Sequence, residues 1–250
     1  MSLTAFITGA TSGIGKATAT LFAKNNFRLI LCGRRGERLE ILQNELSKLT
    51  EVTTLQFDVS NKEQVFNAIN SLPENFKDID VLINNAGNAH GLSSIQEGNI
   101  DDWDAMIDIN VKGLLYVSKA IIPKMTKRNA GFVVNIGSIA GKEVYPNGNV
   151  YCASKHAVNA LNKSMRIDLN KHNIRVAAIH PGAVETEFSE VRFKGDKEKS
   201  KSVYSGYKAL QAEDIADIIH FVVTRPYHVN IEDLIVYPTA QATATIINKN

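Results

Sequence analysis

A tyrosine and a lysine stand four residues apart in this chain, Tyr151 and Lys155, and Ser138 precedes the tyrosine by thirteen residues. On a helix, positions i and i+4 share one face, roughly 5–6 Å apart. At an effective dielectric of about 20, a lysine charge at that distance favours the ionised tyrosine by roughly 3 kcal/mol, or about two pKa units. A tyrosine with a lowered pKa can take a proton from an alcohol or return one to a carbonyl. The pair therefore predicts acid–base chemistry on an alcohol or ketone.

A glycine-rich turn opens the chain, with the spacing Gly9-x3-Gly13-x-Gly15 between an expected strand and an expected helix. Glycines let the backbone turn sharply and approach a pyrophosphate, which rests on the helix N-terminus. The spacing is not the Gly-x-Gly-x-x-Gly of the common dinucleotide fingerprint, and a tight turn with no ligand is the alternative. We expect the first dinucleotide contacts from Gly9, Thr11, Ser12, Gly13, Ile14 and Gly15.

The end of the second expected strand decides which dinucleotide is preferred. An acidic residue there would hold the ribose hydroxyls of NAD, but this chain has Gly33-Arg34-Arg35. A guanidinium suits the 2′-phosphate of NADP in charge and in hydrogen-bond geometry. The sequence therefore predicts NADP (NADPH); the alternative is an arginine pair exposed to water.

Two further strand ends belong to the expected cofactor site. Asp58, followed by Val59, either accepts a hydrogen bond from the adenine amino group or caps the next helix. After the fourth strand, the small residues of Asn85-Ala86-Gly87 let the backbone pass close to the adenosine ribose.

Short β-branched runs alternate with amphipathic stretches along the whole chain, which predicts one α/β domain over residues 1–250 with a doubly wound parallel sheet, a Rossmann fold. The expected strands are Ala5–Thr8, Arg28–Cys32, Val52–Phe57, Val81–Asn84, Phe132–Gly137, Arg175–His180 and Leu234–Tyr237. The expected helices are Ile14–Asn25, Glu37–Leu49, Lys62–Leu72, Asp102–Thr126, Val150–Lys171 and Glu213–Thr224. The stretch of roughly Gly182–Gly206 lacks clear periodicity, and we expect a substrate lid at about 183–210.

Composition excludes several classes of protein. A net charge of +2 and a single mixed charge cluster argue against a nucleic-acid partner, and no run approaches the 18 apolar residues that a membrane helix needs. A strand starting at Thr4 leaves no room for a signal peptide, so we expect a cytoplasmic protein. Neither Cys32 nor Cys152 has metal-ligand spacing, so we expect free thiols and no metal.

Taken together, these motifs resemble the short-chain dehydrogenase/reductase family in its single-domain form. The resemblance rests on the glycine motif, Asn84-Asn85-Ala86-Gly87, Asn110, Ser138, Tyr151-x3-Lys155 and Pro181-Gly182, in the family's order. It implies a seven-stranded sheet with helices on both faces and hydride exchange with a nicotinamide cofactor.

The resemblance also implies residue roles. Tyr151 is the acid/base, Lys155 lowers its pKa and binds the nicotinamide ribose, and Ser138 donates to the substrate oxygen. Asn110 lies in a helix kink and orders a water that relays protons. The carboxamide is held by the segment that contains Pro181, Gly182, Val184 and Thr186.

The stretch Glu187–Asp196, with His228–Ile231, resembles a narrower branch of NADP-dependent 3-hydroxy acid dehydrogenases that act on serine and allo-threonine and reduce malonic semialdehyde. That branch implies a homotetramer, with a C-terminal tail at about 238–250 in a subunit contact. A substrate carboxylate needs a cation, and Arg192 is the candidate; the alternative is that Arg192 faces solvent or pairs with Glu187 or Glu190. Two other functions stay open: a carbonyl reductase for bulkier ketones or acyl-carrier substrates, and an NADP-binding regulator without catalysis.

Overall fold

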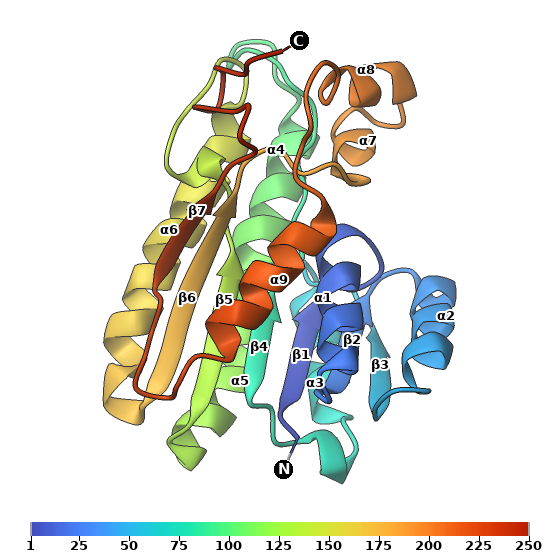
Figure 1. Ribbon diagram of the computed structural model, residues 1–250, viewed down its shortest axis with the longest axis vertical. Helices are drawn as coiled ribbons and strands as arrows, with labels where there is room; N and C mark the ends of the chain where they lie inside the picture. Colours follow the sequence, from blue (N-terminus) through green and yellow to red (C-terminus); the bar gives the residue numbers. More distant parts are fainter. Residues whose placement is uncertain (1, 250) are drawn as a thin grey trace.

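Seven parallel strands form the centre of the protein, in the order β3-β2-β1-β4-β5-β6-β7. The structure is a computed structural model that describes residues 2–249. The strands are β1 (Thr4–Thr8), β2 (Arg28–Gly33), β3 (Val52–Gln56), β4 (Val81–Asn84), β5 (Gly131–Ile136), β6 (Ile174–Pro181) and β7 (Asp233–Val236) (Figure 1). The order reverses between β1 and β4, and ligands of open α/β sheets bind at such a switch point, beyond the carboxyl ends of the strands.

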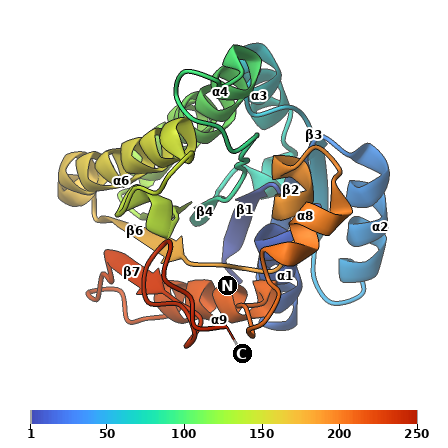
Figure 2. The ribbon, with the colours of Figure 1, turned by 90° about the horizontal axis from the view of Figure 1, so that it is seen from above.

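Helices cover both faces of this sheet (Figure 2). One face carries α1 (Gly13–Lys24), α2 (Gly36–Leu46) and α9 (Ala212–Val223), and the other carries α3 (Lys62–Asn70), α4 (Ile100–Ile107), α5 (Leu114–Arg128) and α6 (Asn149–Leu169). Two separate apolar cores result, one on each side, and all five residues of β1 are buried between them. The prediction of a doubly wound Rossmann sheet is therefore confirmed.

The helix that was expected at Asp102–Thr126 is interrupted. After α4 the chain forms a π-helical segment, η2 (Asp108–Gly113), before α5 continues. A π-helical turn inserts an extra residue and is frequent at functional sites. The segment contains Asn110, so a π-helical irregularity lies where the kink was expected.

The stretch expected to lack regular structure contains two short helices, α7 (Phe188–Arg192) and α8 (Lys197–Ser202). Asp196 caps α8, because its side chain accepts a hydrogen bond from the Lys199 amide. An isolated bridge between Val184 and Leu210 joins the two ends of the stretch. Both helices lie above the carboxyl ends of the strands, at the top of Figure 1. We call residues 183–210 the lid segment.

Short 3-10 turns complete the described elements: η1 (Glu74–Phe76), η3 (Ile139–Gly141) and η4 (Asn170–His172). The turn η3 follows β5 directly, and the side chain of Ser138 accepts a hydrogen bond from the Ala140 amide at its start. This turn fixes the backbone of Ser138 at the carboxyl edge of the sheet.

Candidate active site

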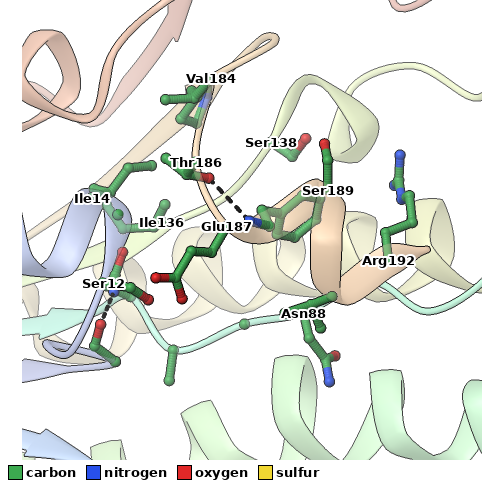
Figure 3. Close-up of a pocket in the computed structure, with 18 of the residues that line it drawn as sticks. Ser12, Ile14, Asn88, Ile136, Ser138, Val184, Thr186, Glu187, Ser189 and Arg192 are labelled. Carbon is green, nitrogen blue, oxygen red and sulfur yellow. Dashed lines mark hydrogen bonds between the residues drawn. The ribbon is translucent and has the colours of Figure 1, made fainter. Parts of the chain in front are cut away.

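A cleft of about 470 Å³ runs along the carboxyl edge of the sheet under the lid segment. It brings together nearly all predicted site residues: Gly9, Thr11, Ser12, Gly13, Ile14, Arg34, Arg35, Asp58, Val59, Asn85, Ala86, Gly87, Ser138, Tyr151, Lys155, Pro181, Gly182, Val184, Thr186 and Arg192. The two others, Gly15 and Asn110, are not part of the cleft lining. Figure 3 shows Ser12 and Ile14 on one side, Ser138 and Arg192 on the other, and Thr186 and Glu187 between them.

The turn after β1 is shaped so that the backbone itself lines the cleft. Gly9 has a φ of +65°, and a Cβ on it would lie 2.9 Å from the Asn85 side chain. A Cβ on Gly15 would lie 2.3 Å from the carbonyl oxygen of Gly9. Only glycine fits at these two positions. The turn fits the close approach that a dinucleotide pyrophosphate requires, with the N-terminus of α1 beside it.

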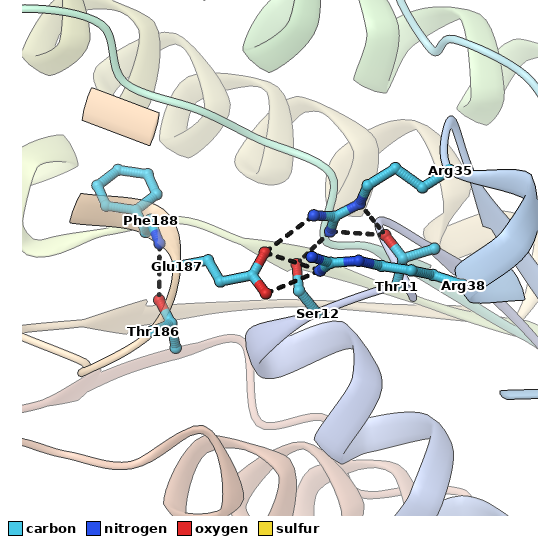
Figure 4. Close-up of polar contacts among 7 residues, drawn as sticks. All are labelled: Thr11, Ser12, Arg35, Arg38, Thr186, Glu187 and Phe188. Carbon is cyan, nitrogen blue, oxygen red and sulfur yellow. Dashed lines mark hydrogen bonds and ion pairs between the residues drawn. The ribbon is translucent and has the colours of Figure 1, made fainter. Parts of the chain in front are cut away.

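Arg35 lines the end of the cleft where we expect the adenosine half of the dinucleotide, and Arg38 beside it was missed in the sequence. Arg35 donates to Thr11 Oγ1 (2.9 and 3.2 Å), Ser12 Oγ (2.8 Å) and Glu187 Oε2 (2.9 Å). Arg38, one turn later on α2, donates to both Glu187 oxygens at 2.7 and 2.9 Å (Figure 4). Burial alone would raise the pKa of Glu187, but the hydrogen bonds and charges of both arginines hold it below its ordinary value. The spacing of Arg35 and Arg38 could have identified the pair.

Arg34 and Asp58 lie beside this cluster. Arg34 is only loosely paired, with its NH1 3.5 Å from Asp58 Oδ2. Asp58 accepts from the amide and hydroxyl of Ser60, at 2.9 and 2.7 Å. These hydrogen bonds and Arg34 outweigh burial and lower the pKa of Asp58. The residue that caps α3 is Asn61, so the alternative of a capping role for Asp58 is wrong.

At the other end of the cleft, Tyr151 of α6 and Ser138 after β5 lie together. Burial raises the pKa of Tyr151 well above its ordinary value, and Tyr145 adds to this rise, whereas the charge of Arg192 and a hydrogen bond from Ser138 oppose it. Ser138 Oγ accepts from the Ala140 amide at 3.1 Å, which leaves the hydroxyl proton for another acceptor. The tyrosine is therefore a protonated phenol at neutral pH.

Lys155 was expected to lower the pKa of Tyr151, but its charge is not among the main causes that shift this pKa. It is 6% exposed, and its Nζ donates to the Ile136 carbonyl at 3.0 Å. Burial lowers the pKa of Lys155 to about 8. Within the polypeptide, Arg192 rather than Lys155 is the cation that lowers the pKa of Tyr151, and burial outweighs it. Spacing placed the two side chains correctly on α6 but carried no information on how deeply both are buried.

Asn110 connects three parts of the site. Its Oδ1 accepts from the Asn88 amide at 2.8 Å, and its Nδ2 donates to the Asn88 carbonyl at 2.9 Å and to Ser154 Oγ at 3.0 Å. These bonds hold the loop after β4 against α6, next to Lys155. A role of Asn110 in a water relay stays a prediction.

Arg192 lies beside Tyr151, where it is half-buried and pairs with neither Glu187 nor Glu190. Its NH2 donates to Tyr145 Oη at 2.8 Å, and its guanidinium carbon lies 4.9 Å from the ring centre of Tyr151 and 5.4 Å from that of Phe188. Glu187 pairs with the arginines of α2 instead. The Arg192 Nε is buried without a hydrogen-bond partner among residues 2–249. The guanidinium of Arg192 therefore lines the cleft next to the phenol, although its unpaired Nε is itself buried.

The tail lies against its own chain. Gln241 Oε1 accepts from the Ala183 amide at 2.8 Å, and Gln241, Ala244 and Ile247 line the cleft. Glu143 accepts from the Ala244 amide and from Tyr237 Oη, each at 2.8 Å. The expected use of the tail in a subunit contact stays a prediction, and lining the cleft is a role that the sequence did not indicate.

Cys32 and Cys152 are free and buried, and burial raises the pKa of both thiols. Residues 2–249 hold no cluster of three or more side chains suited to a metal ion. Among the described helices, none combines the length and apolar character needed to cross a bilayer.

Comparisons with known proteins agree with this geometry. The family model for short chain dehydrogenases matches residues 3–197. The chain is 45% identical over 239 residues to the NADP-dependent 3-hydroxy acid dehydrogenase YdfG of Salmonella typhi (95% of this chain, 96% of the relative). It is 44% identical over 243 residues to sulfoacetaldehyde reductase 2 of Chromohalobacter salexigens (97% and 96%). Among solved structures, the closed form of a serine dehydrogenase complexed with NADP+ superimposes with a TM-score of 0.93 at 41% identity, covering 97% of each chain. The chain therefore belongs to the short-chain dehydrogenase family.

Proposed function

We propose that this protein is an NADP-dependent oxidoreductase that interconverts a short 3-hydroxy acid and its 3-oxo acid. Serine, allo-threonine and 3-hydroxypropionate represent the substrate class. The observation that carries the proposal is the position of Arg192, whose guanidinium lines the cleft 4.9 Å from the ring of the acid/base tyrosine.

NADP is supported as cofactor by the chain's own residues as well as by its relatives. Arg34, Arg35 and Arg38 gather at the adenosine end, and β2 is not followed by an acidic residue that would accept from ribose hydroxyls. Relatives at 45% identity are named NADP-dependent, and a solved relative holds NADP+. The bound nicotinamide supplies or accepts the hydride.

The protein's residues handle the proton. In the reductive direction, the Tyr151 phenol gives its proton to the carbonyl oxygen; in the oxidative direction, the phenolate takes the hydroxyl proton. Ser138 donates to the same oxygen, because its Oγ already accepts from Ala140 and its proton is available. Lys155, with a pKa of about 8, can exchange a proton with groups beside Tyr151.

The charge near these groups supports this substrate class. A guanidinium binds a carboxylate through two parallel hydrogen bonds, and such charge-assisted bonds are roughly twice as strong as neutral ones. Arg192 uses one donor on Tyr145 and keeps Nε unpaired within the described chain. A carboxylate on the substrate would bind the guanidinium donors that face the cleft rather than the buried Nε, and would place the neighbouring oxygen near Tyr151.

A second candidate is reduction of a sulfonate-bearing aldehyde. It is favoured by the relative named sulfoacetaldehyde reductase 2, at 44% identity. Arg192 can bind a sulfonate by the same charge-assisted bonds. A bulky neutral ketone would leave the guanidinium without an anion, and a regulator would not need Ser138, Tyr151 and Lys155 together.

Matched substrates test the proposal. NADPH absorbance should report turnover of serine, allo-threonine and 3-hydroxypropionate with NADP+, and a much lower kcat/KM for the methyl ester of each acid. Faster turnover of the esters would exclude an anionic substrate, and faster reduction of sulfoacetaldehyde than of malonic semialdehyde would favour the second candidate. Light scattering after gel filtration would test the predicted homotetramer.

A further inference from the structure

A buried histidine lies directly behind the Ser138 peptide. His180, near the end of β6, has no exposed surface, and its Nδ1 lies 3.2 Å from the Ser138 carbonyl oxygen. A carbonyl oxygen only accepts hydrogen bonds, so Nδ1 carries the proton in this contact. The proposed proton and hydride transfers do not involve His180.

The preceding residue makes room for the imidazole. A Cβ on Gly137 would lie 2.4 Å from His180 Nδ1, so any other residue there would force the ring away. Gly137 also donates its amide to the Ile179 carbonyl at 2.8 Å, which registers the end of β5 against β6. The ring is thus packed against the backbone of the site rather than directed into the cleft.

Ser138 is held from two sides. Its carbonyl accepts from His180 and, at 2.8 Å, from the Gly141 amide of η3. Its hydroxyl accepts from the Ala140 amide. Removing His180 would leave η3 alone to fix the orientation of this peptide and hence of the hydroxyl.

Two charged groups on the far side of the ring form an ion pair with each other. Asp233, at the start of β7, places Oδ1 3.4 Å from His180 Nε2, while its Oδ2 accepts from Lys142, which follows η3. Lys142 also donates to Asn159 Oδ1 at 2.9 Å. The lysine balances the charge of the carboxylate, and His180 Nε2, which carries no proton in this tautomer, is buried without a hydrogen-bond partner among residues 2–249.

The direction in which the pKa of His180 is shifted agrees with this geometry. Burial and the charge of Lys142 lower the pKa of His180 to about 4, against the opposing effects of Asp233 and the Ser138 carbonyl; Lys155, from α6, also lowers it. The ring is neutral at physiological pH and carries its one proton on Nδ1.

We propose that His180 is a positioning residue for catalysis: packed between the Ser138 peptide and the Lys142–Asp233 pair, it fixes the Ser138 peptide and so aims the Ser138 hydroxyl at the substrate oxygen. The inference deepens the proposed function and rests on the role given there to Ser138.

Two substitutions at His180 separate the hydrogen bond from the space that the ring fills. His180→Asn keeps an N–H near the position of Nδ1, whereas His180→Leu removes it. We expect His180→Leu to lower kcat and kcat/KM together by about tenfold, since small misplacement of a catalytic group is costly. His180→Asn should recover most of the loss, and the Kd of NADPH, measured by fluorescence, should stay within about twofold in both.

Equal losses in the two variants, unchanged kcat in His180→Leu, or a Kd of NADPH that rises as far as kcat falls would each overturn the proposal. Thermal unfolding by circular dichroism would show whether either variant fails to fold, because the site is buried.

If the His180 variants fail to fold, variants of the partly buried Lys142 and Asp233 test the proposal instead. Lys142→Met leaves the Asp233 carboxylate without its cation, which should move the pKa of His180 up toward its ordinary value of about 6.5. The pH profile of kcat should then gain an acid limb that is missing from the wild type and from the Lys142→Met/Asp233→Asn double variant. Identical pH profiles of kcat for Lys142→Met and wild type would overturn the proposed link between His180 and the Lys142–Asp233 pair.

Ser138→Ala distinguishes this inference from the function on which it rests. Full activity in Ser138→Ala would remove the role of Ser138 and with it the proposed mechanism. Loss of activity in Ser138→Ala together with full activity in His180→Leu would leave the proposed function intact and reject the role of His180.

Discussion

The two ends of the cleft use polar residues in opposite ways. At the adenosine end, the side chains of Arg34, Arg35 and Arg38 are 63%, 42% and 45% exposed. At the reaction end, Tyr151 and Lys155 are 8% and 6% exposed. Exposed ion pairs contribute up to about 1 kcal/mol each and are screened by salt, whereas a buried polar group left unpaired costs about 1–3 kcal/mol. Cofactor affinity should therefore be spread over several replaceable groups, while turnover should depend on a few.

Replacing Tyr151 with phenylalanine should give the largest effect. It removes the proton donor and leaves the ring, so kcat should fall by about 10³-fold, within the range for general acid–base catalysis. The Kd of NADPH, measured by fluorescence titration, should change by less than about twofold. A variant that kept its turnover would contradict the assignment of Tyr151 as the acid/base. A variant that lost turnover but kept the cellular effect of the wild-type protein would support a regulator.

The pH dependence of reduction and of oxidation also tests Tyr151 as the acid/base. Burial raises the pKa of Tyr151, so the protonated phenol needed for reduction is present at neutral pH. Reduction should keep its rate from neutral to moderately alkaline pH, whereas oxidation, which needs the phenolate, should gain rate as the pH rises toward that pKa. Rates of oxidation that fell with rising pH, measured under saturating substrate, would reverse the sign expected here.

Arg192→Leu should produce the next largest effect. A charge-assisted hydrogen bond contributes about 1.5–3 kcal/mol, so KM for the hydroxy acid should rise roughly 10- to 100-fold. KM for the methyl ester should change by less than about threefold, and Arg192→Lys should lie between wild type and leucine for the acid. Equal changes for acid and ester would remove Arg192 from substrate recognition.

At the adenosine end the changes should be smaller and salt-dependent. Arg35→Ala should raise the Kd of NADPH by about tenfold at low ionic strength and by less at high ionic strength, because the group is exposed. The Kd of NADH should hardly change. A loss that was the same for both dinucleotides would show that Arg35 supports the glycine turn through Thr11 and Ser12 rather than binding a 2′-phosphate.

Glu187→Gln should have the smallest effect. Its carboxylate shares the donors of Arg35 and Arg38 with any phosphate bound there, so its removal should lower the Kd of NADPH about threefold and leave that of NADH unchanged. Glu190→Gln is the matched control, on the same lid segment but exposed and, among the described residues, without an ion pair. Weaker binding of both dinucleotides would mean that Glu187 instead closes over the bound cofactor.

The fold and the reaction centre could be predicted from the sequence because both depend on local patterns. Strands at the switch point and the pair Tyr151 and Lys155 follow from hydrophobic runs and helical spacing. The contacts that were missed join residues far apart in the chain: Glu187 lies 149 positions from Arg38, and Asp233 lies 91 from Lys142. No spacing rule indicates such pairs, and burial, which sets the pKa of Tyr151, is a property of the finished packing.

The position of the tail has a practical consequence for handling the enzyme. Because Gln241, Ala244 and Ile247 line the cleft, a purification tag or surface linker fused behind this tail would lie close to the cleft. The amino end of β1 lies at the opposite edge of the sheet (Figure 1), so an N-terminal fusion is the better choice for immobilisation, crystallisation or reporter attachment.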